Sequence, residues 1–354
     1  MKKQRLPKAK VSAAVRRVPI RCAINGFGRI GRAALKIILA KKDVEVVAIN
    51  DLTDTETLAH LLKYDTVYGQ YAGDVKSARS AIVVNGKKIP VMVERDPQKL
   101  PWKRLKVDVV LECTGRFVDH GAARAHVHAG ARRVVVSAPT KGGNIKTYLM
   151  GVNDHAYASD EVISNASCTT NCVGPVTRVM VEKFGIKRAA MTTVHSYTAE
   201  QNLVDGPTPP LHKDLRRARA AAQNIIPTTS GAAISITEVF QELKGNFDGF
   251  AMRVPTICVS VTDFTFLTKK KVTSQHINQA LKRAVLHPSY RNVLAVTDRP
   301  LVSSDFIGNP HSAIVDLSLT NVIGGDMVKV VAWYDNEWGY ANRLVEMAEL
   351  VGRK

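Results

Sequence analysis

Hydrophobic and polar residues follow two different patterns before and after residue 167. Before it, short apolar runs alternate with segments of helical periodicity. This pattern predicts strands at 20–24, 44–50, 107–112 and 133–137, a helix through Ala33, Leu35 and Ile38, and another near 119–130. Strands that alternate with helices form parallel sheets, and Asn85-Gly86 between two apolar runs indicates a two-residue hairpin. Residues 20–167 are therefore expected to form an α/β domain with a mostly parallel sheet.

Beyond residue 167 the apolar positions change to long stretches of strict alternation. A helix is predicted from Cys168 to just before Gly185, followed by alternating segments at 191–197 and 250–266. Such strands are typical of an antiparallel sheet with one face on helices. Residues 168–331 are therefore predicted to form an α+β domain with a mostly antiparallel sheet. The segment 332–354, helical from Tyr340, is expected to return to the first domain.

Composition restricts the class of protein further. The 354 residues are 45% hydrophobic and 23% charged, as in a soluble globular protein, and no apolar run approaches the roughly 20 residues that cross a bilayer. The five cysteines include no CxxC pair and no cluster at zinc spacing. This pattern indicates reduced thiols, a cytoplasmic location and no metal site.

The net charge of +19 is high, and part of it lies in residues 1–19, which contain seven Lys and Arg residues and no acidic residue. This segment is interpreted as a basic, disordered extension. An organelle transit peptide is the alternative, since such peptides are rich in Arg and poor in acids. The basic surface suits phosphorylated ligands and would attract nucleic acid weakly and without sequence specificity.

A glycine-rich turn follows the first predicted strand and opens a helix. It reads G-x-G-x-x-G, and the residues expected to bind the cofactor are Asn25, Gly26, Phe27, Gly28, Arg29, Ile30 and Gly31. The glycines allow the tight turn and the close approach of a pyrophosphate to the helix N-terminus. Asp51 ends the next strand, where a carboxylate accepts hydrogen bonds from ribose hydroxyls and repels a 2′-phosphate. The pattern predicts an NAD site.

A cysteine and a histidine form the candidate catalytic pair. Cys168 lies at a predicted helix start, where N–H groups and the helix dipole are expected to lower its pKa. His195, on the strand after that helix, can supply the neighbouring base. From spacing alone, Cys168 could instead be a buried structural thiol. Cys172, one turn later, is interpreted as packing or a resolving thiol. Cys22, Cys113 and Cys258 are expected inside strands.

Several motifs resemble the glyceraldehyde-3-phosphate dehydrogenase family over about residue 20 to the C-terminus. They are I-N-G-F-G-R-I-G-R at 24–32, H-L-L-K-Y-D at 60–65, S-N-A-S-C-T-T-N-C at 164–172, H-S-Y-T at 195–198, F-A-M-R-V-P-T at 250–256 and W-Y-D-N-E-W-G-Y at 333–340. The resemblance implies a glycolytic and gluconeogenic homotetramer. It would oxidise glyceraldehyde 3-phosphate with NAD and inorganic phosphate through a thioester on Cys168, with His195 as the base.

The same resemblance assigns roles to further residues. Thr198 and Arg253 match the substrate-phosphate site. The site of the attacking phosphate is matched by Ser167, Thr169, Arg217, Ser230 and Gly231. Further cofactor-binding residues are Arg95, Thr114, Ser137, Asn336 and Tyr340. The loop at 205–212 would reach the cofactor site of a neighbouring subunit. Arg253 stands in an apolar strand, where an unpaired charge is costly, and this supports an anionic partner over a structural ion pair.

Two other functions remain as alternatives. The segment 305–316 resembles erythrose-4-phosphate dehydrogenase, a sister enzyme with the same Cys/His pair. Thr198 and the turn at 230–233 instead favour the glycolytic form. A nucleic-acid-binding protein is the alternative from another class, but no RNA-recognition motif, run of stacking aromatics or clustered basic helix supports it as the main role.

Overall fold

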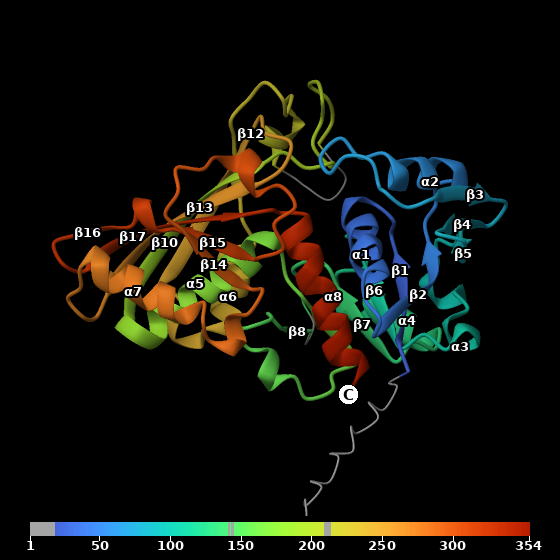
Figure 1. Ribbon diagram of the computed structural model, residues 1–354, viewed down its shortest axis with the longest axis horizontal. Coiled ribbons are helices and arrows are strands. Elements are labelled where there is room, and N and C mark those ends of the chain that lie inside the picture. The colour runs from blue at the N-terminus through green and yellow to red at the C-terminus, as the bar shows by residue number, and fades with distance from the viewer. Residues whose placement is uncertain (1–17, 141, 143–144, 209–213) are drawn as a thin grey trace, which may run out of the picture.

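The chain forms two lobes, each built around one β-sheet, with helix α8 (Trp338–Gly352) packed between them (Figure 1). The structure is a computed structural model that describes residues 18–140, 142, 145–208 and 214–354. Nearly all of the basic extension and part of the 205–212 loop lie outside the described residues. Within the described residues, no helix combines the length and the apolar character needed to cross a membrane.

The first lobe contains a nine-stranded sheet in the order β3-β4-β5-β2-β1-β6-β7-β9-β8. Its strands are β1 (Ile20–Asn25), β2 (Val44–Asn50), β3 (Val75–Ala78), β4 (Ala81–Val84), β5 (Lys87–Met92), β6 (Val109–Glu112), β7 (Arg133–Val136), β8 (Lys146–Thr147) and β9 (Val162–Ser164). The pairs from β5 across to β8 are parallel, as predicted. The predicted hairpin joins β4 to β5, with positive φ at both Asn85 and Gly86, as a type I′ turn requires.

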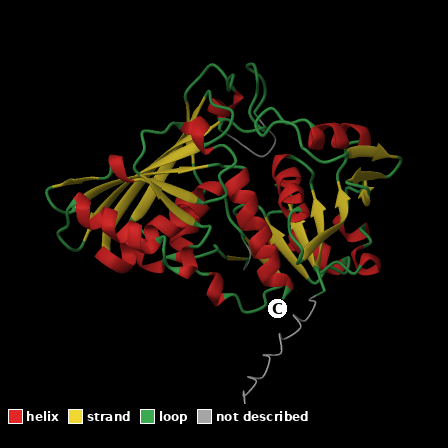
Figure 2. Ribbon diagram, viewed as in Figure 1, coloured by secondary structure: helices red, strands yellow, loops and turns green. Residues whose placement is uncertain are grey.

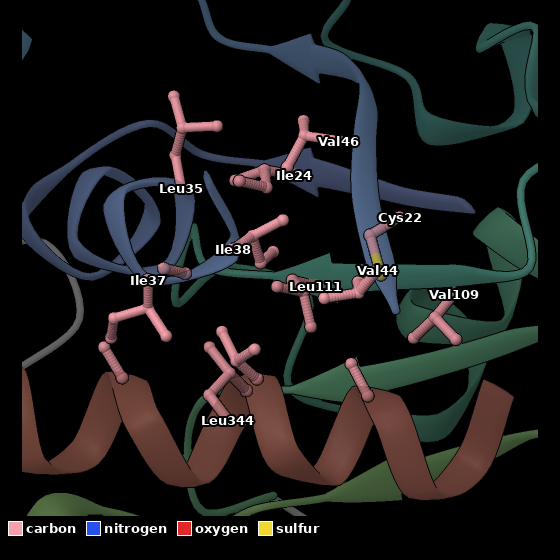
Figure 3. Close-up of a cluster of buried hydrophobic side chains, with 14 of the residues drawn as sticks. Cys22, Ile24, Leu35, Ile37, Ile38, Val44, Val46, Val109, Leu111 and Leu344 are labelled. Carbon is pink, nitrogen blue, oxygen red and sulfur yellow. The ribbon is translucent and has the colours of Figure 1, made fainter. Parts of the chain in front are cut away.

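Helices on both faces of this sheet bury its apolar strands. They are α1 (Arg29–Leu39), α2 (Thr55–Lys63), α3 (Trp102–Leu105) and α4 (His120–His128). Figure 3 shows Leu35 and Ile38 of α1 and Leu344 of α8 around the strand residues Ile24 and Leu111. The last helix of the chain thus shares the core of the first lobe.

The second lobe contains an eight-stranded sheet in the order β11-β12-β10-β13-β17-β15-β14, with β16 beside β17. Its strands are β10 (Ile186–Ser196), β11 (Ile226–Thr229), β12 (Phe247–Val254), β13 (Ser260–Thr268), β14 (Leu294–Thr297), β15 (Ala313–Asp316), β16 (Asn321–Ile323) and β17 (Met327–Tyr334). Only the pairs β10–β12 and β14–β15 are parallel, which confirms the mostly antiparallel sheet.

The alternating stretch 250–266 is two strands rather than one. β12 and β13 lie on opposite sides of β10, one parallel and one antiparallel to it. The chain between them changes direction at Pro255 and Val259, whose φ is 70°. Cys258 therefore lies in a connection, and Cys113 directly follows β6, so only Cys22 of the three is inside a strand.

Three helices cover one face of the second sheet: α5 (Cys168–Phe184), α6 (Ala232–Val239) and α7 (Ser274–Ala284) (Figure 2). Helix α5 begins at Cys168 and ends before Gly185, as the sequence predicts. The Ser167 hydroxyl accepts a hydrogen bond from the Thr170 N–H at 3.1 Å and thereby caps the helix. This cap fixes where α5 begins and therefore the position of Cys168, its first residue.

Candidate active site

The glycine-rich turn connects β1 to α1 and leaves one of its glycines open to a cavity. Gly26 has φ 92°, and a Cβ there would clash with the backbone of Thr114 at 2.8 Å. A Cβ on Gly31 would collide with the Gly26 carbonyl oxygen at 2.2 Å, so helix and turn pack closely. A Cβ on Gly28 would meet no described atom within 4 Å. The three positions match what a pyrophosphate-binding turn needs: two tight contacts within the protein and one side open to the ligand.

The start of α1 offers its backbone to this cavity, whereas the Arg29 side chain serves another purpose. Gly28 is the N-cap, and its position carries no side-chain cap, so the first N–H groups of α1 remain available to an anion. The Arg29 guanidinium instead pairs with Asp65 at 2.9 Å and with Glu337. Arg29 is thus placed to bind a cofactor through its main chain, while its side chain joins the turn to the segment before α8.

Asp51 lies beside the turn at the carboxyl end of the parallel sheet. Its Oδ2 accepts a hydrogen bond from the Phe27 N–H at 2.7 Å, and Oδ1 accepts one from the Thr53 N–H at 2.9 Å. Each carboxylate oxygen has a second lone pair for a ribose hydroxyl. Asp51 lines a cavity of about 610 Å³ together with Asn25, Gly26, Gly28, Arg95, Thr114 and Phe117.

A buried hydrogen-bond network fixes two of the residues that line this cavity, and the sequence did not indicate this network. Glu112, at the end of β6, accepts hydrogen bonds from Asn25 Nδ2 at 2.5 Å and from the Thr114 N–H at 2.8 Å. His126 Nδ1 accepts a hydrogen bond from the Trp102 indole at 3.0 Å, which places the ring proton on Nε2, 3.0 Å from Glu112. The network fixes Asn25 and Thr114, two predicted cofactor residues.

Replacing Asp51 by alanine should raise the use of NADP relative to NAD about tenfold, because a negative charge that repels the 2′-phosphate is removed. The measurement is kcat/KM for both cofactors. Asp54→Ala is the matched control, since Asp54 caps α2 and does not line the cavity. Equal use of NADP and NAD by the unmodified enzyme would show that Asp51 does not select the cofactor.

A second cavity, of about 410 Å³, continues from the first past Cys113 and Thr114 and contains the predicted catalytic pair. Cys168 Sγ lies 3.4 Å from His195 Nε2. His195 Nδ1 lies 2.7 Å from the Ser196 carbonyl oxygen, so Nδ1 carries the proton and Nε2 faces the sulfur as an acceptor. Other predicted residues that line this cavity are Arg29, Ile30, Thr114, Ser137, Ser167, Thr198, Asn336 and Tyr340.

The protonation of the pair differs from the sequence-based expectation. Burial raises the pKa of the Cys168 thiol, although the Arg253 charge and hydrogen bonds from Thr169 and the helix start lower it. Burial and the Arg253 charge lower the pKa of His195 to about 3. The expected fall of the thiol pKa is therefore wrong for the free protein, because desolvation outweighs the helix start. Both shifts favour a thiol beside a neutral imidazole over a thiolate–imidazolium pair.

Arg253 and Thr198 form the first of the two predicted anion sites. Arg253 Nη1 donates to Thr198 Oγ1 at 2.9 Å and to the Ser196 carbonyl oxygen at 3.1 Å. Its Nε is buried without a hydrogen-bond partner among the described residues. No ion pair joins the half-buried Arg253 to a described carboxylate within 4.0 Å, so a structural salt bridge does not account for its position. A half-buried guanidinium with an open, buried Nε donor suits an anion close to the sulfur.

The residues expected at the second anion site lie at the margin of the cavity rather than in it. Arg217, in the short 3₁₀ segment Leu215–Ala218, is buried and donates to Thr228 Oγ1 at 2.9 Å and to Glu200 at 3.3 Å. The Thr169 hydroxyl lies 2.9 Å from the Tyr334 hydroxyl. Ser230 and Gly231 precede α6, and Gly231 approaches Pro139, which lines the cavity. Of this set, only Ser167 lines the cavity directly.

Glu200 is a cavity residue that the sequence analysis missed. It pairs with Arg217, and its pKa falls: burial raises it, but the Thr198 hydrogen bond and the Arg253 and Arg217 charges outweigh that effect. The carboxylate thus stands between both expected anion sites. Its place two residues after Thr198, in H-S-Y-T-A-E, was the signal that could have indicated it.

Fold and site together define a class of enzyme: an oxidoreductase with a dinucleotide cavity that leads to a cysteine thiol beside a histidine. No group of three or more potential metal ligands occurs among the described residues. Family models agree with this class. Residues 20–120 match the NAD binding domain, and residues 167–336 the C-terminal domain, of glyceraldehyde 3-phosphate dehydrogenase.

Curated relatives extend the match over nearly the whole chain. Glyceraldehyde-3-phosphate dehydrogenase 2 of Synechocystis sp. is 51% identical over 94% of this chain and 98% of its own length. Glyceraldehyde-3-phosphate dehydrogenase of Geobacillus stearothermophilus is 51% identical over 95% of this chain and 99% of its own. The chloroplastic glyceraldehyde-3-phosphate dehydrogenase B of Pisum sativum is 48% identical over 98% of this chain and 78% of its own. The chain belongs to the glyceraldehyde-3-phosphate dehydrogenase family, and its cofactor is NAD.

Proposed function

We propose that this enzyme converts glyceraldehyde 3-phosphate, NAD and inorganic phosphate to 1,3-bisphosphoglycerate and NADH. The observation that carries the proposal is the Cys168–His195 pair at 3.4 Å, in the cavity that continues from the glycine-rich turn and beside the Arg253 guanidinium. A thiol, a base and a cation around one point are the groups needed to oxidise a phosphorylated aldehyde through a thioester.

The chemistry follows from the protonation state of the pair. Cys168 Sγ attacks the aldehyde carbon while His195 Nε2 accepts the thiol proton and passes it to the carbonyl oxygen, which gives a neutral thiohemiacetal. NAD would be held by the glycine-rich turn, Asp51, Arg95, Thr114, Ser137, Asn336 and Tyr340, and when bound it would supply the hydride acceptor. His195 Nε2, which is free again, takes the hydroxyl proton as the thioester forms. Phosphate then attacks the acyl carbon, and the Cys168 sulfur leaves as the thiolate.

Two anion sites divide the phosphate groups between them. Arg253 and Thr198 are proposed to bind the phosphate of the aldehyde. Ser167, Thr169, Arg217, Ser230 and Gly231 are proposed to bind the attacking phosphate. The second assignment requires Arg217 to exchange its contact with Glu200 for the phosphate. The exchange is supported by the position of Glu200, which lines the cavity and lies 3.3 Å from Arg217.

NADH formation should require inorganic phosphate, because only phosphate attack releases the acyl group as an acyl phosphate. The measurement is absorbance at 340 nm with glyceraldehyde 3-phosphate, with and without phosphate and with NADP in place of NAD. Sustained turnover without phosphate would identify a hydrolytic dehydrogenase. Faster turnover of erythrose 4-phosphate would instead favour the sister enzyme, which none of the relatives named above supports.

We also propose a homotetramer in the cytoplasm. Exposed apolar side chains on the loop after β10 and on the open face of the second sheet support association: Leu203, Val204, Ile225, Phe250 and Met327. The five free cysteines support a reducing compartment. Light scattering after gel filtration tests the homotetramer, for which four times the mass of the chain is expected.

A fluorescent fusion with and without residues 1–19 distinguishes a cytoplasmic location from organelle import.

The domain division follows the same reasoning. We propose a basic extension at 1–19, an NAD-binding domain at 20–167, a catalytic domain at 168–331 and a C-terminal segment at 332–354. The packing of α8 against α1 and β6 supports the return of the last segment to the NAD-binding domain.

A further inference from the structure

The side-chain amide of Asn336 is held by the hydroxyl groups of two serines, Ser196 and Ser260. Ser196 Oγ lies 2.9 Å from Asn336 Oδ1, and Ser260 Oγ lies 3.2 Å from the same oxygen. All three side chains are buried. They come from the end of β10, the start of β13 and the residue pair that follows β17, so three separate elements meet at one amide oxygen.

The contacts of the two hydroxyls explain which end of the amide they face. The Ser196 N–H donates to Ser260 Oγ at 3.2 Å, which leaves the Ser260 hydroxyl proton to donate to Asn336. The single hydroxyl proton of Ser196 is shared between Asn336 Oδ1 at 2.9 Å and the Val259 carbonyl oxygen at 3.0 Å, so Ser260 gives the amide its unshared hydrogen bond. With Oδ1 turned toward the serines, the two protons of Nδ2 point the other way. Nδ2 has no hydrogen-bond partner among the described residues, and Asn336 lines the cavity that contains Cys168.

The backbone next to Ser260 adopts an energetically unfavourable conformation at Val259. Val259 has φ 70°, a conformation that a β-branched residue adopts only when its surroundings enforce it. Its neighbours contact two consecutive residues: Cys258 donates to Asp335 Oδ1 at 3.4 Å, and Ser260 donates to Asn336. The connection before β13 is thus attached to the 335–336 segment at two points. Two points of attachment are expected to hold the Asn336 side chain in one orientation.

We propose that Ser196 and Ser260 are positioning residues that orient the Asn336 amide so that its N–H groups face the carboxamide of the nicotinamide ring. The proposal rests on the proposed function, in which Asn336 contacts NAD. A fixed amide donor selects one orientation of the carboxamide, and therefore one face of the ring toward the Cys168 adduct. The two serines thereby act on the geometry of hydride transfer without contacting substrate or cofactor.

The test compares two ligands that differ only in the nicotinamide end. We expect Ser196→Ala/Ser260→Ala to raise the Kd for NAD about three- to tenfold in calorimetry, the range expected from loss of hydrogen-bond support. The Kd for ADP-ribose, which has no nicotinamide, should not change. With NAD deuterated at C4, the variant should transfer a detectable fraction of hydride to the opposite face. Ser312→Ala is the matched control, because this buried serine hydroxyl has no partner among the described residues.

The outcomes separate this proposal from the proposed function. Equal weakening of NAD and ADP-ribose, or unchanged NAD affinity and single-face transfer, would overturn the positioning role. Failure of the unmodified enzyme to form NADH with phosphate would overturn the proposed function instead. If the alanine variants do not fold, Ser196→Cys and Ser260→Cys keep the side-chain size, weaken the donor, and enter the same measurements. Threonine at each position should restore the selectivity for NAD.

Discussion

Replacing Cys168 by serine should abolish NADH formation, with a loss of at least about four orders of magnitude in kcat, the effect typical of removing a nucleophile. A serine hydroxyl is far less acidic and a weaker nucleophile than a thiol, and burial already opposes ionisation at this position. Steady-state assays at 340 nm measure the loss. Cys172→Ser is the control, since Cys172 lies one turn later on α5 and packs into the core.

Chemical modification provides an independent check of the same assignment. Iodoacetamide should label Cys168 first and inactivate the enzyme in proportion, because Cys168 lines a cavity with His195 Nε2 at 3.4 Å, whereas Cys22, Cys172 and Cys258 are buried. Burial also raises the pKa of each of those three thiols. Cys113 lines the same cavity as Cys168, but burial and the Glu112 charge raise the pKa of its thiol. Labelling of Cys172 or Cys22 before Cys168, or full activity after Cys168 is labelled, would contradict the nucleophile assignment.

The features that the sequence predicted well are local ones. The glycine-rich turn, the Asn85-Gly86 hairpin and the helix start at Cys168 each depend on a few consecutive residues, whose conformational preferences decide the backbone. The parallel sheet and the antiparallel sheet also followed from the local alternation of strands and helices. Cys168 and His195 were paired correctly because one helix leads directly into the next strand.

The features that the sequence did not predict depend on contacts between distant residues. Alternation over 250–266 could not show that the chain reverses at Val259 to place β13 on the other side of β10. The support of Asn336 by Ser196 joins residues 140 positions apart. The direction of the Cys168 pKa shift depends on three opposing effects: desolvation raises the pKa, whereas the hydrogen bonds at the helix start and the Arg253 charge lower it. The extent of desolvation is known only once both lobes are packed.

Arg253→Ala and Arg217→Ala should separate the two phosphate sites, because each guanidinium is expected to serve a different anion. Loss of a hydrogen bond to a charged group costs about 1.5–3 kcal/mol, or roughly ten- to a hundredfold in affinity. Arg253→Ala should raise the KM for glyceraldehyde 3-phosphate by that factor. Arg217→Ala should raise the KM for inorganic phosphate instead. The measurement varies aldehyde and phosphate independently in steady state.

The two variants also differ in their expected effect on Cys168. The Arg253 charge lowers the pKa of the thiol, so its removal should raise that pKa further and slow alkylation by iodoacetamide at fixed pH. Arg217 does not act on the thiol in this way, and its variant should be alkylated at the normal rate. Arg219→Ala is the matched control, since Arg219 is two residues from Arg217 and pairs with Asp205 on the surface. If Arg217→Ala left the phosphate KM unchanged, the role of Arg217 would be structural, and the attacking phosphate would bind elsewhere.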